Sequence, residues 1–366
     1  MSKARELAEL GAVYDSGALS NRNMVINGAM QVNQRGDQTG LSSSSTYGID
    51  RFRLTLFSHG TFSISQSSTA PDGFTSSFKV DCTTADTSLA AGAYVICQHR
   101  LEAQNLQHLN YGSSSAKKVT LSFHVRSNVT GTYALNVYAA DSDKQITKNY
   151  TINSADTWEK KEITIDALTD GSGITNDNGL GIELSWFLAA GSTYTGSSQT
   201  TWNTYTGNEN DYARGQAADL ASSTSNEWYI TGVQMELGTE ATPFEHRSFG
   251  EELHKCQRYF EVIVSGDSKE IGGGNYYSSS SIHCPTIFET SKRTNSYSVT
   301  VTGGSNYFRV YRNSSSDDFN GFTGATRANF NRCLLYAQSG VSGSAGHGLE
   351  LLTNNASAKI VIDDEL

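Results

Sequence analysis

The chain has 366 residues, which is long enough for two or three domains with their own cores, and only 17% of the residues are charged. Its 34 glycines and its many serines, threonines and asparagines favour strands and turns over helices, while 18 tyrosines and 15 phenylalanines supply enough large side chains to exclude a disordered chain. A formal net charge of −10, without any run rich in lysine and arginine, argues against nucleic acid as a partner.

The chain opens on MSKARELAEL, in which Ala4, Leu7 and Ala8 recur at helical spacing. A helix this short needs a partner surface to become ordered, so residues 1–22 are predicted to dock onto another protein, and a frayed terminus is the alternative. This opening lacks the apolar core of a signal peptide, and the chain contains no run of about 18 apolar residues. We therefore expect folding in a cytoplasm and no membrane insertion.

From Asn23 onward, short alternating stretches of apolar and polar residues are bounded by Gly, Ser, Asn or Asp. This pattern predicts an all-β fold, with an antiparallel β-sandwich over residues 23–246. The clearest predicted strands are 119–127, 132–140, 160–168, 181–189 and 228–237. Trp158, Trp186 and Trp228 lie in or beside these strands, and we expect all three in the core.

Residues 189–227 separate the last two of these strands and are far longer than an ordinary loop. They carry Tyr194, Trp202 and Tyr205 among Asn and Thr, without hydrophobic periodicity. Because flat aromatic rings stack on the apolar face of a sugar ring, we predict that these three residues bind a glycan. The alternative is that they pack on the sandwich or against a neighbouring subunit.

Beyond Pro243, the residues Ser248 and Glu251 stand in capping-box register. Phe249, Leu253, Cys256 and Phe260 fall on one helical face, which predicts a connecting helix over 247–262.

Alternating stretches then continue in SYSVTVTGG, NYFRVYRNS, NRCLLYAQS and ASAKIVIDDEL, and they predict a smaller β-sandwich module over 263–366. A module of this size leaves strand edges and apolar faces uncovered, so we expect it to hold a homotrimer together with the connecting helix.

The sequence contains no motif that is typical of an enzyme or of a cofactor site: a GxSxG elbow, a GxxxxGK[ST] loop and an HExxH pair are all missing. Carboxylates that could act in pairs on a glycan are Asp141 with Asp143, Glu159 with Glu162, and Glu183 near Trp186, but acids at such positions are ordinarily solvated. We predict a protein without catalytic residues or cofactor.

Two features bear on metal binding. The loop ADSDK at 140–144 could supply oxygen ligands to calcium, but one loop does not make a site. The five cysteines form an odd set without a CxxC pair, which indicates free buried thiols rather than zinc ligands or disulfides. We predict no metal site.

An ordered set of motifs resembles the carbohydrate-binding-module-like jelly roll of bacteriophage tail and fibre proteins. The motifs are NMVINGAMQVNQRG (23–36), YGIDRF (47–52), QHRLE (98–102), TLSFHVRS (120–127), TW with KKEITI (157–165) and ITGVQMELGTEATPFEHRSFGEELHKCQRYF (230–260). The opening MSKAREL is also similar to the start of marine-phage fibre proteins. One departure is His124, where that family commonly carries an aromatic residue, often Trp.

The resemblance implies a structural virion protein: a tail-fibre or appendage subunit that docks to other virion proteins through residues 1–22 and contributes to attachment to host-surface glycan. It also implies a homotrimer, since fibres of tailed phages are usually trimeric. A capsid decoration protein and a glycan depolymerase are the alternatives.

Overall fold

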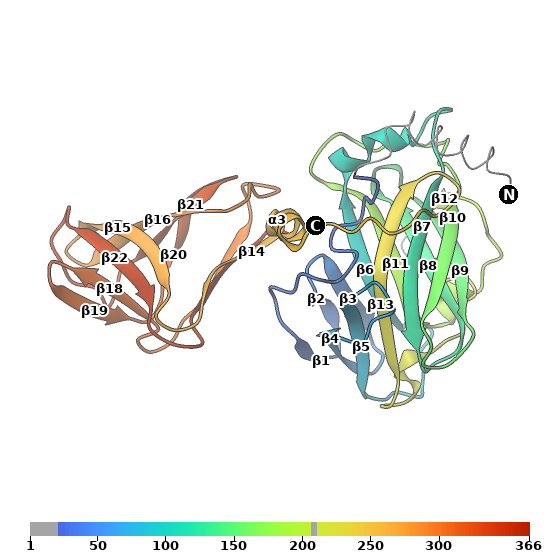
Figure 1. Cartoon of the computed structure of the whole chain (residues 1–366), viewed down its shortest axis with the longest axis horizontal. Helices are drawn as coiled ribbons and strands as arrows, with labels where there is room; N and C mark the ends of the chain where they lie inside the picture. The colour runs from blue at the N-terminus through green and yellow to red at the C-terminus, as the bar shows by residue number, and fades with distance from the viewer. Residues whose placement is uncertain (1–20, 206–210) are drawn as a thin grey trace. The chain divides into compact units, whose positions relative to one another are not determined.

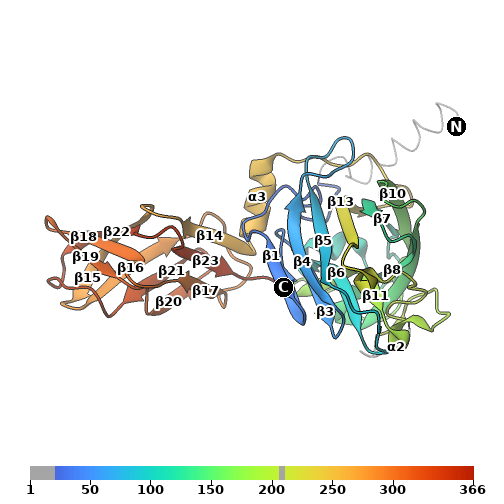
Figure 2. The same cartoon turned by 90° about the horizontal axis from the view of Figure 1, so that it is seen from below.

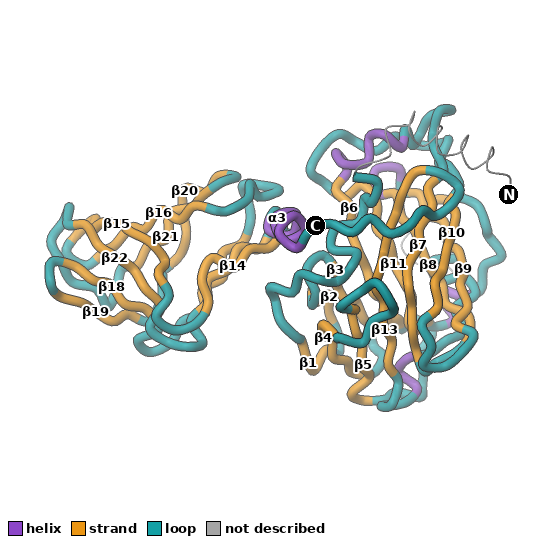
Figure 3. Tube along the Cα trace, viewed as in Figure 1, coloured by secondary structure: helices purple, strands orange, loops and turns teal. Residues whose placement is uncertain are grey.

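The computed structural model describes residues 21–205 and 211–366, and most of its elements are strands (Figures 1 and 3). Contacts divide the chain into two compact units, Met1–Glu252 (unit 1) and Leu253–Leu366 (unit 2). The docking segment expected at 1–22 lies outside the described residues, apart from its last two. Within the described ranges, no helix is long and apolar enough to cross a membrane.

Unit 1 is a sandwich of two antiparallel sheets, which Figure 2 shows from a second direction. The six-stranded sheet contains β1 (Gln38–Leu41), β4 (Thr61–Ser67), β5 (Ser77–Thr84), β13 (Glu227–Leu237), β7 (Val119–Ser127) and β10 (Glu159–Ile165), in that spatial order. The seven-stranded sheet contains β12 (Asn203–Thr204), β9 (Lys144–Ile152), β8 (Gly131–Ala139), β11 (Leu180–Ala190), β6 (Tyr94–Glu102), β3 (Phe52–Phe57) and β2 (Ser44–Tyr47). This is the predicted jelly-roll sandwich, and the five predicted strands correspond to β7, β8, β10, β11 and β13.

Short helical turns connect these strands: η1 (Ala103–Leu109), η2 (Ala140–Ser142), α2 (Ser192–Thr195) and η3 (Leu220–Ser222). The predicted long loop at 189–227 therefore contains α2, β12 and η3. The last strand of unit 1, β13, lies in the middle of its sheet and pairs with β5 on one side and β7 on the other.

The core of unit 1 lies between the two sheets and is rich in aromatic side chains. Trp186 of β11 and Trp228 of β13 are fully buried, as predicted. The ring of Trp186 meets the edge of Phe123 at a centroid distance of 5.8 Å. Trp158 is only half-buried and lies outside this core, with its ring 6.2 Å from that of Tyr229. The prediction for Trp158 is wrong because this residue precedes β10 instead of pointing inward from it.

Unit 2 is a smaller sandwich, as predicted. Its three-stranded sheet contains β14 (Phe260–Ser265), β23 (Lys359–Asp363) and β17 (Ser298–Thr302). Its seven-stranded sheet contains β19 (Ser315–Phe319), β18 (Phe308–Arg312), β22 (Gly348–Thr353), β15 (Glu270–Ser278), β16 (Ser281–Ile287), β21 (Arg332–Ala337) and β20 (Gly324–Asn329). A separate core fills the space between the two sheets and includes Tyr276, Phe308 and Leu335.

The helix between the sandwiches, α3, runs over Phe249–Gln257 and is shorter than the predicted 247–262. Its N-terminus is capped as the capping-box pattern predicts, with Ser248 Oγ accepting from the backbone N of Glu251 at 3.3 Å. The helix ends early because Phe260 begins β14, in which backbone pairing with β23 replaces helical hydrogen bonds. On the predicted apolar stripe, Cys256 is buried whereas Phe249 is 56% exposed. All five cysteines are free and buried, as expected.

Candidate functional site

The outward face of the seven-stranded sheet of unit 1 carries polar side chains that hydrogen-bond to one another. Along β6, alternation points Cys97 into the core and Gln98 outward. Strand register places Gln98 opposite Arg53 of β3 and Ser185 of β11, and places Arg100 opposite Glu183. We call Arg53, Gln98, Arg100, Glu183 and Ser185 the Glu183 cluster.

Glu183 is the centre of this cluster, and only 8% of its side chain is exposed. Its Oε2 accepts from Arg100 Nε at 2.7 Å and from Arg53 Nη2 at 3.2 Å. Its Oε1 accepts from Gln98 Nε2 at 2.6 Å and from Ser185 Oγ at 3.3 Å. Because both carboxylate oxygens are paired with donors, the buried charge is stabilised and the surrounding side chains are held in place.

The cluster reaches solvent mainly through Arg100, whose side chain is 25% exposed, against 11% for that of Arg53. Gln98 accepts from Arg53 Nε at 2.9 Å and from Thr55 Oγ1 at 2.6 Å through its amide oxygen. The amide and the guanidinium groups therefore have fixed orientations before any ligand arrives, which reduces the entropic cost of binding.

Half-buried tyrosines surround the Glu183 cluster, and we call them the tyrosine rim: Tyr47, Tyr94, Tyr138, Tyr205 and Tyr212. Tyr138 lies opposite Glu183 in the register of β8 and β11. The ring of Tyr205 lies 4.7 Å from that of Tyr138 and 5.6 Å from that of Tyr212. On the other side, the guanidinium carbon of Arg53 lies 5.9 Å from the ring of Tyr47. Aromatic rings thus border a polar, hydrogen-bonded centre.

The phenol groups of Tyr138 and Tyr212, two residues of the rim, have pKa values raised by their surroundings. Burial, together with the charge of Glu183 and the proximity of Tyr205, raises the pKa of Tyr212 well above its usual value. Burial also raises the pKa of Tyr138, and its hydroxyl donates to Asp143 Oδ1 at 2.9 Å, which raises the pKa further. At these two positions the rim therefore presents neutral aromatic rings with hydroxyl groups, rather than phenolates.

The structure brings two of the three predicted glycan-binding residues near this face. Tyr205 belongs to the rim, and Tyr194 packs beside it, with its ring 6.2 Å from that of Tyr212. Tyr194 is only 8% exposed, so it offers little free ring surface. Trp202 makes different contacts, because its Nε1 donates to the backbone oxygen of Asp166 at 2.7 Å and its ring meets the edge of Tyr111 at 5.9 Å. Glycan binding by these three residues stays a prediction.

Sequence reasoning missed Arg53, Gln98 and Arg100 as members of a site. A signal was present in the alternation of VICQHRL, which sets Gln98 and Arg100 on the face opposite to the apolar residues of β6. Nothing in the sequence, however, shows that these two residues meet Glu183 of β11, more than 80 positions further along the chain.

The acids considered for catalysis make other contacts in the structure. Glu183 points outward from β11, whereas Trp186 is in the core on the other face, so the two are not partners. Asp141 Oδ2 accepts from the backbone N of Thr175 at 2.9 Å. Glu159 and Glu162 form ion pairs with neighbouring lysines of β10. Among the described residues, no group of three or more His, Cys, Asp or Glu could hold a metal ion.

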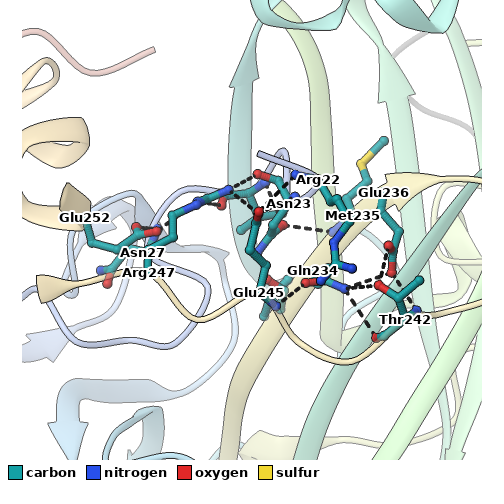
Figure 4. A network of polar contacts seen from close by, with 12 residues as sticks. Arg22, Asn23, Asn27, Gln234, Met235, Glu236, Thr242, Glu245, Arg247 and Glu252 are labelled. Carbon is teal, nitrogen blue, oxygen red and sulfur yellow. Dashed lines mark hydrogen bonds and ion pairs between the residues drawn. The ribbon is translucent and has the colours of Figure 1, made fainter. Parts of the chain in front are cut away.

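A second polar network in unit 1 joins the first described residues to the segment that follows β13 (Figure 4). The backbone N of Asn23 donates to Glu245 Oε2 at 2.9 Å, and Glu245 N donates to Gln234 Oε1 at 2.7 Å. Arg247 donates to Glu252 Oε1 at 2.8 Å and to the backbone oxygen of Asn23. We call Asn23, Gln234, Glu245, Arg247 and Glu252 the terminal clasp. Through the terminal clasp, Glu245 and Arg247 of the ATPFEHR segment hold the first described residues in place.

His59 joins three loops of unit 1 through two aspartates. Its side chain is fully buried, with Nε2 2.8 Å from Asp219 Oδ1 and Nδ1 3.5 Å from Asp86 Oδ2. Burial by itself would lower the pKa of His59, but the hydrogen bond to Asp219 and the charges of Asp219 and Asp86 outweigh it and raise the pKa. Cys82, whose pKa is raised to about 11 by burial and by nearby acids, stays a neutral thiol beside this group.

A raised pKa in the folded state means that His59 stabilises unit 1 at low pH. The contribution is complete below the unfolded pKa of about 6.5 and is lost as pH rises through the folded pKa. We expect His59→Gln to destabilise unit 1 at about pH 6 and to have a clearly smaller effect at about pH 9. Urea unfolding of both proteins at the two pH values measures this difference. An effect of equal size at both pH values would contradict the prediction.

No protein-family model matches the chain, and no curated protein is similar to it in sequence. Some solved structures are similar over part of it. Tailspike protein 4 of bacteriophage CBA120, in its enzymatically active domain, aligns with a TM-score of 0.31 and 13% identity, covering 59% of this chain and 22% of that one. The chain thus spans about a fifth of the length of that tailspike chain.

Carbohydrate-binding modules align in the same way. The family 11 module of cellulase Lic26A-Cel5E from Clostridium thermocellum has a TM-score of 0.29 and 12% identity, covering 55% of this chain and 99% of that one. The CBM22-1 xylan-binding domain of Xyn10C from Paenibacillus barcinonensis has a TM-score of 0.27 and 10% identity, covering 60% and 96%. Likenesses this weak carry no argument about function, which must rest on the residues of this chain.

Proposed function

We propose that unit 1 is a non-catalytic glycan-binding domain and that its binding face is the tyrosine rim with the Glu183 cluster. The observation that carries this proposal is the combination of half-buried aromatic rings with a fixed polar centre on one sheet face. A pyranose ring has an apolar face that stacks on aromatic rings and hydroxyl groups at its edge that bind amide, carboxylate and guanidinium groups. The rim supplies the aromatic rings, and the cluster supplies the polar contact mainly through the partly exposed guanidinium group of Arg100.

The charge of unit 1 favours neutral sugars. Residues 253–366 contain equal numbers of acidic and basic residues, so the net charge of −10 falls on residues 1–252. A strongly acidic domain repels acidic polymers as they approach, and this repulsion is weakest for uncharged ligands. We therefore place neutral oligosaccharides first among the ligands of unit 1.

Binding to this face is tested with the full chain on an array of neutral oligosaccharides, followed by calorimetry with the best ligand. We expect Tyr138→Ala, Tyr205→Ala and Arg100→Gln each to weaken binding by about tenfold, the loss of one good hydrogen bond or stacking contact. The matched control is Arg126→Gln, which removes an arginine that pairs with Asp156 on the other sheet and should leave affinity unchanged.

Two results would contradict the glycan-binding proposal: no neutral oligosaccharide bound by the wild-type chain, or unchanged affinity in all three variants of this face. Release of reducing ends from a bound polymer, abolished by Glu183→Gln, would instead favour the depolymerase.

For the biological setting, we propose a structural component of a tailed-phage particle, and a tail-fibre or appendage subunit before a capsid decoration protein. The support is the resemblance of residues 23–36 and 230–260 to phage tail and fibre proteins. We also propose a homotrimer held through unit 2, in which β17 is an edge strand with unpaired backbone groups on one side. Mass spectrometry of purified particles tests whether the chain is part of the phage particle. Light scattering tests the homotrimer, because it compares the mass in solution with the 39.6 kDa of one chain. Particles that lack the chain, or a monomer at micromolar concentration, would overturn the respective proposal.

A further inference from the structure

Unit 2 exposes two arginines for which the described part of the chain offers no acidic partner. Arg327 lies within β20, two residues before its end at Asn329, and Arg332 begins β21 after the turn. Both are exposed, and both line the same surface hollow of about 440 Å³, together with Pro285, Asn329 and Leu334. Two positive charges thus face one hollow.

The other arginines of the same sheet are paired. Arg309 Nε lies 2.6 Å from Asp318 Oδ1, and Arg312 Nη2 lies 2.9 Å from Asp317 Oδ2. Since unit 2 as a whole has as many acidic as basic residues, acids were available for pairing. The missing partners of Arg327 and Arg332 are therefore a local feature of this turn.

Exposed apolar surface adjoins these charges. A second hollow of about 470 Å³ shares Asn329 and Arg332 with the first and is also lined by Ile287 and Phe330. Ile287 is 75% exposed and Phe330 is 48% exposed. Large apolar side chains that are exposed side by side, one at the end of β16 and one on the turn, are typical of contact surfaces.

Hydrogen bonds hold this turn rigidly. The hydroxyl of Tyr297 lies 3.1 Å from the backbone oxygen of Asn329 and 2.9 Å from that of Arg332. Lys292 N donates to the backbone oxygen of Phe330 at 2.7 Å. Asn329 Oδ1 accepts from the backbone N of Arg332 at 3.1 Å. The backbone of Arg327 has a φ of 52°, in the left-handed region that non-glycine residues rarely adopt. The turn is thus held in one conformation before binding, which favours affinity.

We propose that this turn is a second binding site, specific for an acidic sugar. Arg327 and Arg332 would bind the carboxylate or phosphate group, because guanidinium groups match the geometry of both anions. Phe330 would stack on the apolar face of the sugar ring. Two arginines on a unit with no net charge are too few to follow a nucleic-acid backbone, so a polynucleotide is not the ligand. The chain would then bind neutral sugars on unit 1 and acidic sugars on unit 2.

The test is calorimetry of the full chain with three probes: oligogalacturonate, which carries carboxylates, mannose 6-phosphate, and neutral maltotriose. We expect one or both acidic probes to bind and the double variant R327Q/R332Q to weaken that binding by about a hundredfold, with about tenfold for each charged contact. Phe330→Ala should weaken it by about tenfold. Which acidic probe binds more tightly identifies the anionic group.

Three controls make the outcome decisive. Lys269→Gln removes an exposed positive charge elsewhere on unit 2 and should not change affinity. Arg100→Gln on unit 1 should also leave acidic-sugar binding intact, which separates this site from the proposed neutral-glycan face. An unchanged melting temperature shows that the double variant is folded. No binding of either acidic probe at millimolar concentration, equal binding of maltotriose through the same residues, or full affinity in the double variant would overturn the proposal.

Discussion

Lys292→Met is expected to lower the free energy of unfolding of unit 2 by about 3–5 kcal/mol, the usual cost of removing one partner of a buried ion pair. The side chain of Lys292 is fully buried, and its Nζ donates to Glu261 Oε2 and to the backbone oxygen of Gln257. Glu261 is itself only 2% exposed. Burial lowers the pKa of Lys292, while the hydrogen bond and charge of Glu261 oppose this effect. Removing the amine leaves a carboxylate buried without its counter-charge.

The two units can be followed separately in this experiment, because all four tryptophans lie in residues 158–228 of unit 1. Tryptophan fluorescence reports unit 1, and hydrogen exchange in β14 and β23 reports unit 2. Lys269→Met is the exposed control and should change stability by less than about 0.5 kcal/mol. The double change K292M/E261L should recover part of the loss, because it removes both charges. A loss below about 1 kcal/mol in Lys292→Met would show that the pair is not a determinant of stability.

Arg247→Met is expected to destabilise unit 1 by about 3 kcal/mol through the terminal clasp. Only 5% of the Arg247 side chain is exposed, and it lies between Glu245 and Glu252, whose side chains are 16% and 8% exposed. It also donates to the backbone oxygen of Val25 at 3.2 Å. The variant leaves two carboxylates and two backbone oxygens without this donor. Urea unfolding followed by tryptophan fluorescence measures the loss.

Hydrogen exchange can distinguish a local loss of the terminal clasp from a general loss of stability in unit 1. We expect hydrogen exchange of residues 23–27 to accelerate more than that of the central strand β13, because these residues depend on Arg247 for their attachment. Arg22→Met is the matched control: its guanidinium donates at the surface to the backbone oxygen of Pro243 at 3.0 Å and should contribute less than about 1 kcal/mol. Equal losses in the two variants would refute a special role for Arg247.

Local patterns predicted some of the strands that have one buried face. VTLSFHVRS and EWYITGVQMEL alternate or are apolar throughout, and both are strands with nearly the predicted ends. The sequence did not single out β1, β12, β19 or β20, which are short or polar and depend on pairing with neighbours for their conformation. It also did not single out β3, β5 and β6, although their inward side chains are buried. The end of α3 was missed for a related reason, because Phe260 and Val262 fit a helical stripe and a strand equally well and pairing with β23 decides between them.

The Glu183 cluster shows how little of the candidate site can be predicted from the sequence. The sequence shows Glu183 as an acid in an apolar strand and suggests Trp186, three residues away, as its neighbour. Strand alternation instead places the two side chains on opposite faces of the sheet. The sequence also points to Tyr194, Trp202 and Tyr205, but it predicts the same role for all three. Tyr194 is buried beside Tyr212, and the indole of Trp202 is hydrogen-bonded to the backbone of Asp166. Only Tyr205 belongs to the tyrosine rim.

The sequence by itself determined the all-β class, the order of the two sandwiches, the cap of α3 at Ser248 and the burial of Trp186 and Trp228, because each of these follows from residues close together in the chain. Only the tertiary structure shows that Arg53, Arg100 and Glu183 meet on one sheet face and that Arg247 lies against Asn23, more than 200 positions earlier in the chain. The physical reason is that charges and hydrogen-bonding groups act over a few ångströms, and only the pairing of strands distant in sequence sets which groups come that close.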